Sequence, residues 1–173
     1  MTSAEIILGI VTLQRAGELV VSSYNTRRLV ARGAVEAAPR HYPLIVAVHA
    51  AWLISLWAFG RDQPVNVPAL LVYLVLQGFR FWVMWNLGAR WTTRIIVLPK
   101  QPLVSGGPYR LLSHPNYAVV AGEIAILPLV LDLPLLAAIF TILNAAVLAI
   151  RVPAENRALA ASRGTIARPA SDD

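Results

Sequence analysis

Two short stretches of the chain carry side chains that can bind a charged small molecule containing a ring. The first is residues 106–117, with the sequence GGPYRLLSHPNY. Tyr109 and Tyr117 offer flat faces for a ring or for a cation. The backbone amides near Gly106 and Gly107 can hydrogen-bond a carboxylate. This stretch therefore indicates a binding site rather than a spacer.

The second stretch is residues 151–159, with the sequence RVPAENRAL. Arg151 and Glu155 are four positions apart, so they share one helix face if Pro153 lies in the first turn of a helix. Glu155 can accept hydrogen bonds from an ammonium group or a hydroxyl. Arg151 can bind a carboxylate, or it can lower the pKa of a reacting hydroxyl.

Cysteine and histidine usage limits the chemistry. The chain has no cysteine, which excludes disulfides, thiolate metal sites and a cysteine nucleophile. It has 3 histidines, and we expect no histidine-rich metal cluster. His114 is a general base, a ligand contact or a helix-entry residue bonded to nearby backbone. His49 lies in an apolar run and is expected to be a hydrogen-bonded packing residue, and His41 is expected to lie at a helix entry.

The elements that position these stretches belong in a membrane. Hydrophobic residues make up 57% of the 173 residues and charged residues 14%, and the mean hydropathy is +0.62. A soluble domain carries about 25% charged residues, so a water-soluble enzyme is excluded, and the apolar content excludes disorder. The composition predicts an all-α, polytopic membrane bundle, a single domain over residues 1–173 with about five transmembrane helices. The apolar runs are 4–24, 43–59, 67–87, 118–131 and 133–150.

Basic residues predict the orientation of the bundle. Twelve of the 15 Lys and Arg residues fall on one side of five spans, and the positive-inside rule places that side in the cytoplasm. The N-terminus is then outside and the tail cytoplasmic. The net charge of +6 reflects this bias, and we expect no nucleic-acid partner. The residues are Arg27, Arg28, Arg32, Arg40, Arg90, Arg94, Lys100, Arg110, Arg151, Arg157, Arg163 and Arg168.

Between the third and fourth runs lies an irregular segment, residues 88–116. Its glycines and prolines exclude one continuous helix. Irregular backbone at a membrane boundary is tolerated where protein covers it or where it lines a cavity. We therefore expect this segment, together with the motif at 151–159, to form the functional core, about residues 88–160.

Ionisable side chains also occur inside the predicted spans, where they are costly. Arg15 and Glu18 are three apart and share a helix face. They form an internal ion pair or border a polar cavity. Arg80, three positions after Gln77, either snorkels to the interface or reaches into a substrate pocket.

Two further groups inside the runs have alternative roles. Glu123 and Asn144 could face each other across the last helical hairpin, as packing contacts or beside a ligand. Trp82, Trp85 and Trp91 are expected to form an interfacial belt at the basic end of the third run.

In order and spacing, these motifs resemble the isoprenylcysteine carboxyl methyltransferase family, including its bacterial members. The family pattern is a Gly-x-Tyr turn, Arg-His-Pro-x-Tyr, a helical hairpin and Arg-x-x-x-Glu-Glu, and the likeness covers roughly residues 91–159. Three departures are Ser113 in place of the arginine, Pro153 within the last motif, and Asn156 in place of the second glutamate. They put the identity of the methyl acceptor in doubt more than that of the cofactor.

The resemblance implies an integral membrane enzyme that uses S-adenosylmethionine. It implies catalytic roles for Arg151, Glu155 and His114, with Glu155 on the cofactor and Arg151 facing the methyl acceptor. Arg80 is a second candidate for the acceptor pocket. The implied cofactor-binding residues are Gln101, Pro102, Leu103, Val104, Tyr109, His114, Pro115, Asn116, Tyr117 and Glu155.

Methyl transfer from a sulfonium needs alignment and desolvation rather than a metal. The implied acceptor is a lipophilic small molecule or a lipidated one, entering sideways from the membrane lipids. Its carboxylate or acidic hydroxyl would be O-methylated, as in a prenylcysteine-like or polyketide lipid. Two alternatives are an NADPH-dependent reductase of the sterol type, which shares His-Pro-x-Tyr, and a non-catalytic membrane scaffold.

Overall fold

The computed structural model describes residues 1–166 apart from 100 and 103. Within these residues it contains five α-helices, which confirms the all-α prediction. Four of the helices in the described part are long and apolar enough to cross a membrane, and α4 is shorter, as the fourth apolar run predicted. The helices are α1 (Ser3–Val30), α2 (Tyr42–Gly60), α3 (Val67–Leu87), α4 (Pro115–Val130) and α5 (Pro134–Ile166).

Local sequence explains where the helices begin. Thr2 caps α1 in a reciprocal capping box, in which the Glu5 amide donates to Thr2 Oγ1 (3.1 Å) and the Thr2 amide donates to the Glu5 carboxylate (2.8 Å). Asn66 Oδ1 caps α3 by accepting from the Ala69 amide at 3.1 Å. Pro115 opens α4, where its missing amide donor costs nothing.

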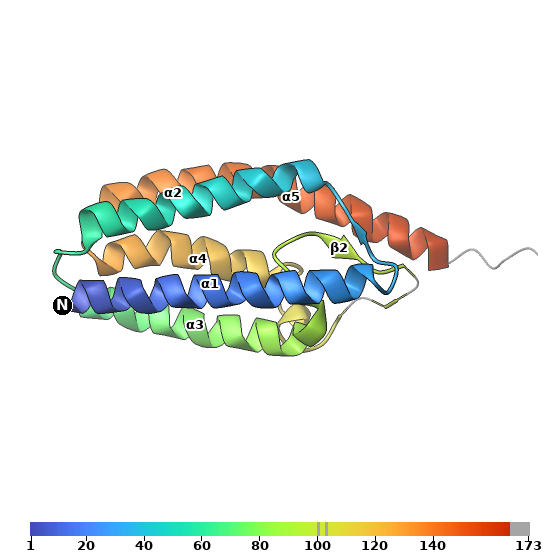
Figure 1. The fold of residues 1–173 in the computed structure, drawn as a ribbon, viewed down its shortest axis with the longest axis horizontal. Helices are drawn as coiled ribbons and strands as arrows, with labels where there is room; N and C mark the ends of the chain where they lie inside the picture. Colours follow the sequence, from blue (N-terminus) through green and yellow to red (C-terminus); the bar gives the residue numbers. More distant parts are fainter. Residues whose placement is uncertain (100, 103, 167–173) are drawn as a thin grey trace, which may run out of the picture.

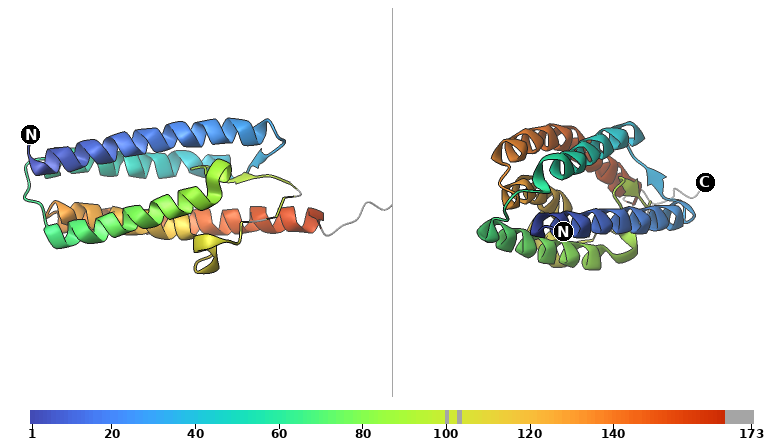
Figure 2. Two further views of the ribbon diagram at one scale, coloured as in Figure 1. Left: turned by 90° about the horizontal axis from the view of Figure 1, so that it is seen from below. Right: turned by 60° about the vertical axis from the view of Figure 1, so that its left-hand side comes forward.

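The helices run lengthwise in one bundle (Figure 1). α4 packs against both α3 and α5, and α2 packs against α5. Seen toward its end, α2 and α5 lie on one side and α1 and α3 on the other (Figure 2). Gly122 permits the close approach of α3 and α4, because a Cβ atom there would lie 3.0 Å from Leu76 Cδ1.

An apolar core fills the end of the bundle that holds the N-terminus. Leu8, Leu56 and Leu127 are completely buried there. Its other buried members are Ala4, Val11, Trp52, Tyr73, Val120, Ile124, Val130, Leu131 and Phe140.

The irregular segment between α3 and α4 is built from short pieces, as its glycines and prolines predicted. It contains η2 (Gly88–Arg90), β2 (Ile96–Val97) and η3 (Gly107–Arg110). The first loop contributes η1 (Pro39–His41) and the strand β1 (Val35–Glu36), which pairs antiparallel with β2. This pairing, which the sequence did not predict, ties the α1–α2 loop to the irregular segment.

The end of the last helix differs from the expectation. The fifth apolar run was expected to end at Ile150, with Pro153 in the first turn of a new helix. This is wrong, because α5 continues through Pro153. A proline inside a membrane helix removes one amide donor, which the surroundings can tolerate. Arg157 Nε donates to the Pro153 carbonyl at 3.3 Å, one turn further along the same helix. Arg151 and Glu155 still lie one turn apart on the same helix.

The tryptophan belt is only partly correct. Trp82 and Trp85 are 42% and 89% exposed, as interfacial residues would be. Trp91 is 2% exposed, so its assignment to the belt is wrong. It lies in the irregular segment, which folds it inward, and its indole donates to Asn116 Oδ1 at 3.4 Å.

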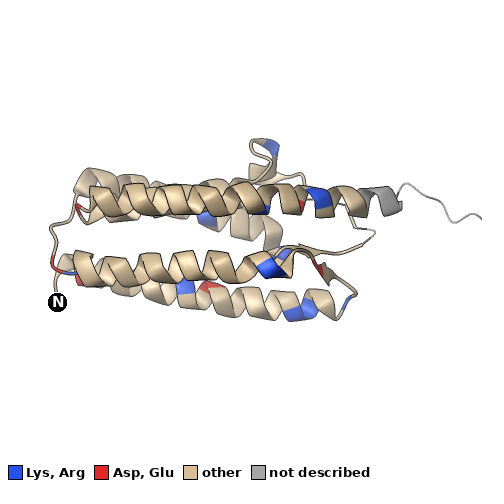
Figure 3. Ribbon diagram, turned by 90° about the horizontal axis from the view of Figure 1, so that it is seen from above, with Lys and Arg blue, Asp and Glu red and all other residues tan. Residues whose placement is uncertain are grey.

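Basic residues gather in the half of the bundle away from the N-terminus (Figure 3). Arg61 is at the opposite end, paired with the adjacent Asp62 at 3.1 Å. Lys100 and Arg168, two of the residues used to predict orientation, lie outside the described residues.

Candidate active site

A cavity of about 790 Å³ opens inside the basic half of the bundle. The irregular segment and all five helices of the described chain contribute to its wall. α2 supplies mostly apolar side chains together with Tyr42 and His49, and the other helices supply both charged and apolar side chains. The site is therefore assembled from parts that are far apart in the sequence.

Most of the residues that the sequence singled out for a site line this cavity. Pro115 is buried in the first turn of α4 and is not part of the lining, and Leu103 lies outside the described residues. The residues that do line it are Arg80, Gln101, Pro102, Val104, Tyr109, His114, Asn116, Tyr117, Arg151 and Glu155.

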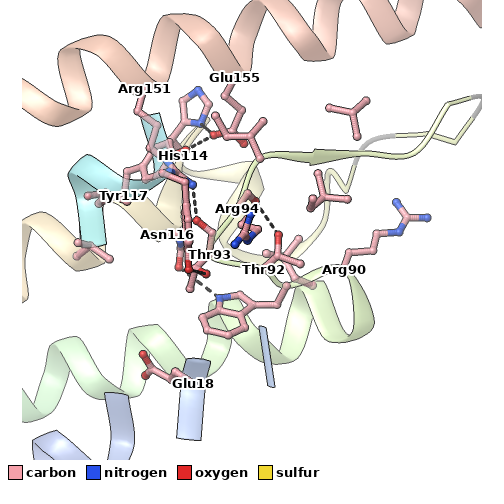
Figure 4. A pocket seen from close by; sticks show the side chains of 18 of the residues that line it. Glu18, Arg90, Thr92, Thr93, Arg94, His114, Asn116, Tyr117, Arg151 and Glu155 are labelled. Atoms are coloured by element: carbon pink, nitrogen blue, oxygen red, sulfur yellow. Dashed lines mark hydrogen bonds and ion pairs between the residues drawn. The ribbon is translucent and has the colours of Figure 1, made fainter. Parts of the chain in front are cut away.

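The two motif stretches meet at Tyr117, on the first turn of α4. Its hydroxyl donates to Glu155 Oε2 and accepts from Arg151 Nε, the latter at 3.0 Å. The Arg151 guanidinium also lies 5.8 Å from the centre of the Tyr117 ring. In Figure 4 these three side chains lie together with His114 on one side of the cavity. The arrangement fixes the carboxylate and the guanidinium relative to each other.

His114 caps this group. Its ring stacks on Tyr117 with the centroids 5.4 Å apart. Its Nε2 is 2.9 Å from Asn156 Oδ1 and therefore donates to it, while Nδ1 is 4.0 Å from Glu155 Oε2. Asn156, one of the departures from the family pattern, thus holds the histidine ring in place.

Thr93 is a contact point that the sequence analysis missed. Its carbonyl accepts from Arg151 Nη2. Its amide donates to Ser22 Oγ on α1 (2.9 Å), and its hydroxyl bonds Ser22 Oγ (2.8 Å) and Tyr42 of α2 (3.2 Å). Nothing in the local sequence marks Thr93, because its role depends on partners from three helices.

A second group of contacts orders the loop before η3. Arg90 donates to the Pro102 carbonyl at 2.8 Å and to Gln101 Oε1 at 2.7 Å. Gly107 has φ of +56°, and a Cβ atom there would lie 2.5 Å from Asn86 Nδ2. Only glycine combines that backbone conformation with so close a neighbour.

Tyr109 presents a neutral phenol to the cavity. Burial, with a smaller contribution from the negative charge of Glu155, raises the pKa of Tyr109 to about 12. Nearby, Arg94 pairs with Glu36 of β1 at 2.9 Å and stacks over the Tyr42 ring at 4.2 Å. The β1–β2 pair is thereby fastened to the wall of the cavity.

A layer of charges separates the cavity from the apolar core. Arg80 donates to Glu18 from Nε (2.6 Å) and Nη2 (2.5 Å), and its Nη1 is 2.5 Å from Glu123. Arg15 lies 3.0 Å from Glu18 and 2.9 Å from Glu123, and Gln77 donates to Glu123 at 2.7 Å. Within this described cluster, the two positive charges of the arginines therefore equal the two negative charges of the glutamates.

The layer of charges decides between the alternative roles that the sequence left open for the Arg15–Glu18 pair and for Arg80. Arg15 and Glu18 form an ion pair and also line the cavity, so both of their expected roles hold. Arg80 is 4% exposed, so snorkelling to the interface is wrong; it lines the cavity while bound to two carboxylates that hold it inward.

Glu123 and Asn144 have separate surroundings. Glu123 bonds residues of α1 and α3, as described above. Asn144 on α5 is 2% exposed, and its Oδ1 is buried without a hydrogen-bond partner among the described residues. No hydrogen bond therefore joins Asn144 Oδ1 to Glu123 among the described residues.

The remaining candidates for chemistry are His49 and groups of side chains that could hold a metal ion. His49 Nδ1 is 2.8 Å from the Ile45 carbonyl, which confirms a hydrogen-bonded packing role, and the residue also lines the cavity. Within the described part of the chain, no three His, Asp or Glu side chains come together as a group that could hold a metal ion.

Comparisons with known proteins agree with the motifs. The model of the isoprenylcysteine carboxyl methyltransferase family matches residues 69–161. The uncharacterized protein YpbQ of Bacillus subtilis (strain 168) is 37% identical over 159 residues, covering 89% of this chain and 95% of that protein. An uncharacterized protein of Haemophilus influenzae is 23% identical over 104 residues, 57% of this chain and 60% of that protein. No solved structure gives a significant match. With more than half of its residues matched, the chain belongs to the isoprenylcysteine carboxyl methyltransferase family.

Proposed function

We propose that the chain is a membrane methyltransferase that uses S-adenosylmethionine to O-methylate a lipophilic acceptor. One observation carries the proposal. Tyr117 from the first motif stretch hydrogen-bonds both Glu155 and Arg151 from the second, on the wall of one cavity. Residues some forty positions apart thus form one site, in a chain whose family is that of membrane methyltransferases.

The donor and acceptor groups of the cavity fit this cofactor. A cavity of about 790 Å³ lies within the roughly 300–1,000 Å³ usual for cofactor sites. The Glu155 carboxylate can accept from an ammonium or a ribose hydroxyl, and Tyr109 offers a neutral aromatic face. Gln101 adds an amide at the same wall. When bound, the cofactor supplies a methyl group already activated by its sulfonium.

The residues of the chain then position the reacting groups and exclude water. Tyr117 holds the Glu155 carboxylate, so that the cofactor end of the site is fixed before binding. Arg151 is held between the Tyr117 hydroxyl and the Thr93 carbonyl on the cavity wall. We assign it to the acceptor oxygen. A guanidinium there stabilises a carboxylate or a deprotonating hydroxyl.

The walls indicate where the acceptor enters. α2 contributes Ile45, Val46 and Leu53 to the cavity, an apolar surface suited to a lipid chain. The basic residues in the half of the bundle away from the N-terminus suit a charged, water-soluble cofactor that arrives from the cytoplasm. This orientation places the N-terminus outside and α5 ending in the cytoplasm, in a bacterial cytoplasmic membrane. A prenylcysteine-like or polyketide lipid fits such a cavity.

Binding of labelled cofactor by the purified protein in detergent tests the proposal. We expect saturable binding of S-adenosylmethionine and none of NADPH. Binding of NADPH alone would identify a reductase, and binding of neither would identify a scaffold. Mass spectrometry of lipid extracts incubated with the protein and S-adenosylmethionine should then show a lipid that gains one methyl group, with Glu155→Ala protein as the matched control.

A further inference from the structure

His49, on the wall of the cavity, has a ring nitrogen that can accept a proton. Its Nδ1 is 2.8 Å from the carbonyl oxygen of Ile45. A carbonyl can only accept, so Nδ1 carries the hydrogen. In the neutral ring, Nε2 is then an unprotonated nitrogen with its lone pair available.

The surroundings leave that lone pair open. No described residue hydrogen-bonds Nε2, and Nε2 is not among the sealed, unpartnered polar atoms of the described chain. His49 itself belongs to the cavity wall. The bond to the Ile45 carbonyl fixes the ring through Nδ1, so Nε2 is the nitrogen left for a bound molecule.

The ring lines the same cavity as Arg151, the residue proposed to face the acceptor. Arg15 on α1 and Arg80 on α3 also belong to this wall. Glu18, the carboxylate that lines the same part of the cavity, is already bound to Arg15 and Arg80. An acceptor oxygen in this cavity would therefore have the His49 Nε2 as an uncommitted base in its described wall.

His114 is less suited to the same task. Its Nε2 donates to Asn156 and its ring stacks on Tyr117, while its Nδ1 faces the Glu155 carboxylate. Both nitrogens point into the group that would hold the cofactor. Under the proposed function, His114 is therefore assigned to the cofactor end of the cavity and His49 to the acceptor end.

We propose that His49 is the catalytic base and that the acceptor is a lipid hydroxyl rather than a carboxylate. The inference rests on the proposed function. The acceptor oxygen forms a bond to the methyl carbon, and the carbon–sulfur bond breaks with its electron pair passing to sulfur. The hydroxyl proton passes to His49 Nε2, and from there to water when the product leaves. A carboxylate, already deprotonated, would have no use for such a base.

The test compares His49→Gln with His41→Gln in the full chain, since His41 lies in η1 and not on the cavity wall. The probes are a phenol bearing a long alkyl chain and a fatty acid of matching length. Loss of a general base should lower turnover of the phenol by about 10²–10⁴-fold in His49→Gln, with cofactor affinity unchanged and His41→Gln behaving as wild type. Added imidazole should restore part of the phenol turnover of His49→Ala.

A second arm needs neither cofactor nor turnover. In protein labelled with ¹⁵N-histidine, the His49 signals should report a neutral ring protonated at Nδ1, and the Nε2 signal should move when the alkyl phenol is added. A charged ring, or one protonated at Nε2, overturns the inference. So does phenol turnover by His49→Gln within about twofold of wild type. Absence of cofactor binding in the wild-type protein would instead reject the proposed function, and the ¹⁵N spectra would still decide whether His49 can accept a proton.

Discussion

The two ends of the bundle are built on different principles. At the N-terminal end, side chains such as Leu8, Leu56 and Leu127 interdigitate and leave no exposed surface. At the other end the helices surround a cavity of about 790 Å³, and hydrogen bonds between distant residues replace apolar packing. A layer of paired charges lies between them. The difference shows that the packed end can hold the helices together while the open end is left free for binding.

Removing Arg80 should give the largest loss of stability, because this residue lies in the charged layer between the two ends of the bundle. Arg80→Leu leaves Glu18 and Glu123 buried with only Arg15 to balance them. We expect the free energy of unfolding to fall by about 3–5 kcal/mol, measured by denaturant unfolding in detergent micelles. The control is Arg61→Leu, whose side chain is 61% exposed and which should change stability by less than about 0.5 kcal/mol. Equal losses in the two variants would show that the charge layer does not hold the ends together.

The next largest effect is expected from creating a cavity in the packed end. Leu56→Ala should cost about 2–3 kcal/mol of unfolding free energy through lost packing, while the folded fraction keeps wild-type affinity for S-adenosylmethionine. Ile54→Ala, which removes a side chain 68% exposed on the same helix, serves as the control and should be nearly neutral. A change in cofactor affinity in Leu56→Ala would mean that the two ends are not independent.

Within the open end, the two α5 residues should separate binding from turnover. Glu155→Ala should weaken binding of S-adenosylmethionine by about 10–100-fold, the value of a hydrogen bond to a charged group. Arg151→Ala should leave that affinity within about threefold and mainly lower acceptor turnover. Isothermal titration and turnover assays on the same preparations measure both quantities. Equal effects on cofactor affinity would reject this division of roles.

The smallest effect is expected at Tyr109. Because its pKa is raised from 10.0 to about 12, its phenol stays neutral up to pH 10. The cofactor affinities of wild type and Tyr109→Phe should therefore change in parallel as the pH rises to about 10, which a series of binding titrations would measure. A difference between the two that grows with pH would indicate that the phenol ionises in the site.

Local sequence patterns predicted the parts of the fold that depend on local physics. The apolar runs located the helices, and Gly107 and Pro115 marked the irregular segment and the start of α4. The motif residues around Tyr117 and Glu155 were identified by their order and spacing. Each of these signals depends on the chemistry of a few neighbouring residues.

Errors arose where distant partners decide the structure. Arg80 does not snorkel to the interface, because Glu18 and Glu123 on two other helices hold it inward. Trp91 is buried because the segment that follows α3 folds back into the bundle. The continuation of α5 through Pro153 likewise depends on tertiary surroundings, which no local rule for proline contains.

The walls contributed by α1 and α2 have a consequence for how members of this family could diverge. The family model begins at residue 69, after the helices that carry Ser22, Tyr42 and His49. Those two helices line part of the cavity, whereas the matched part supplies Glu155 and its neighbours. Under the proposed function, substitutions in α1 and α2 would change which lipids fit the cavity without altering the residues that hold the methyl donor.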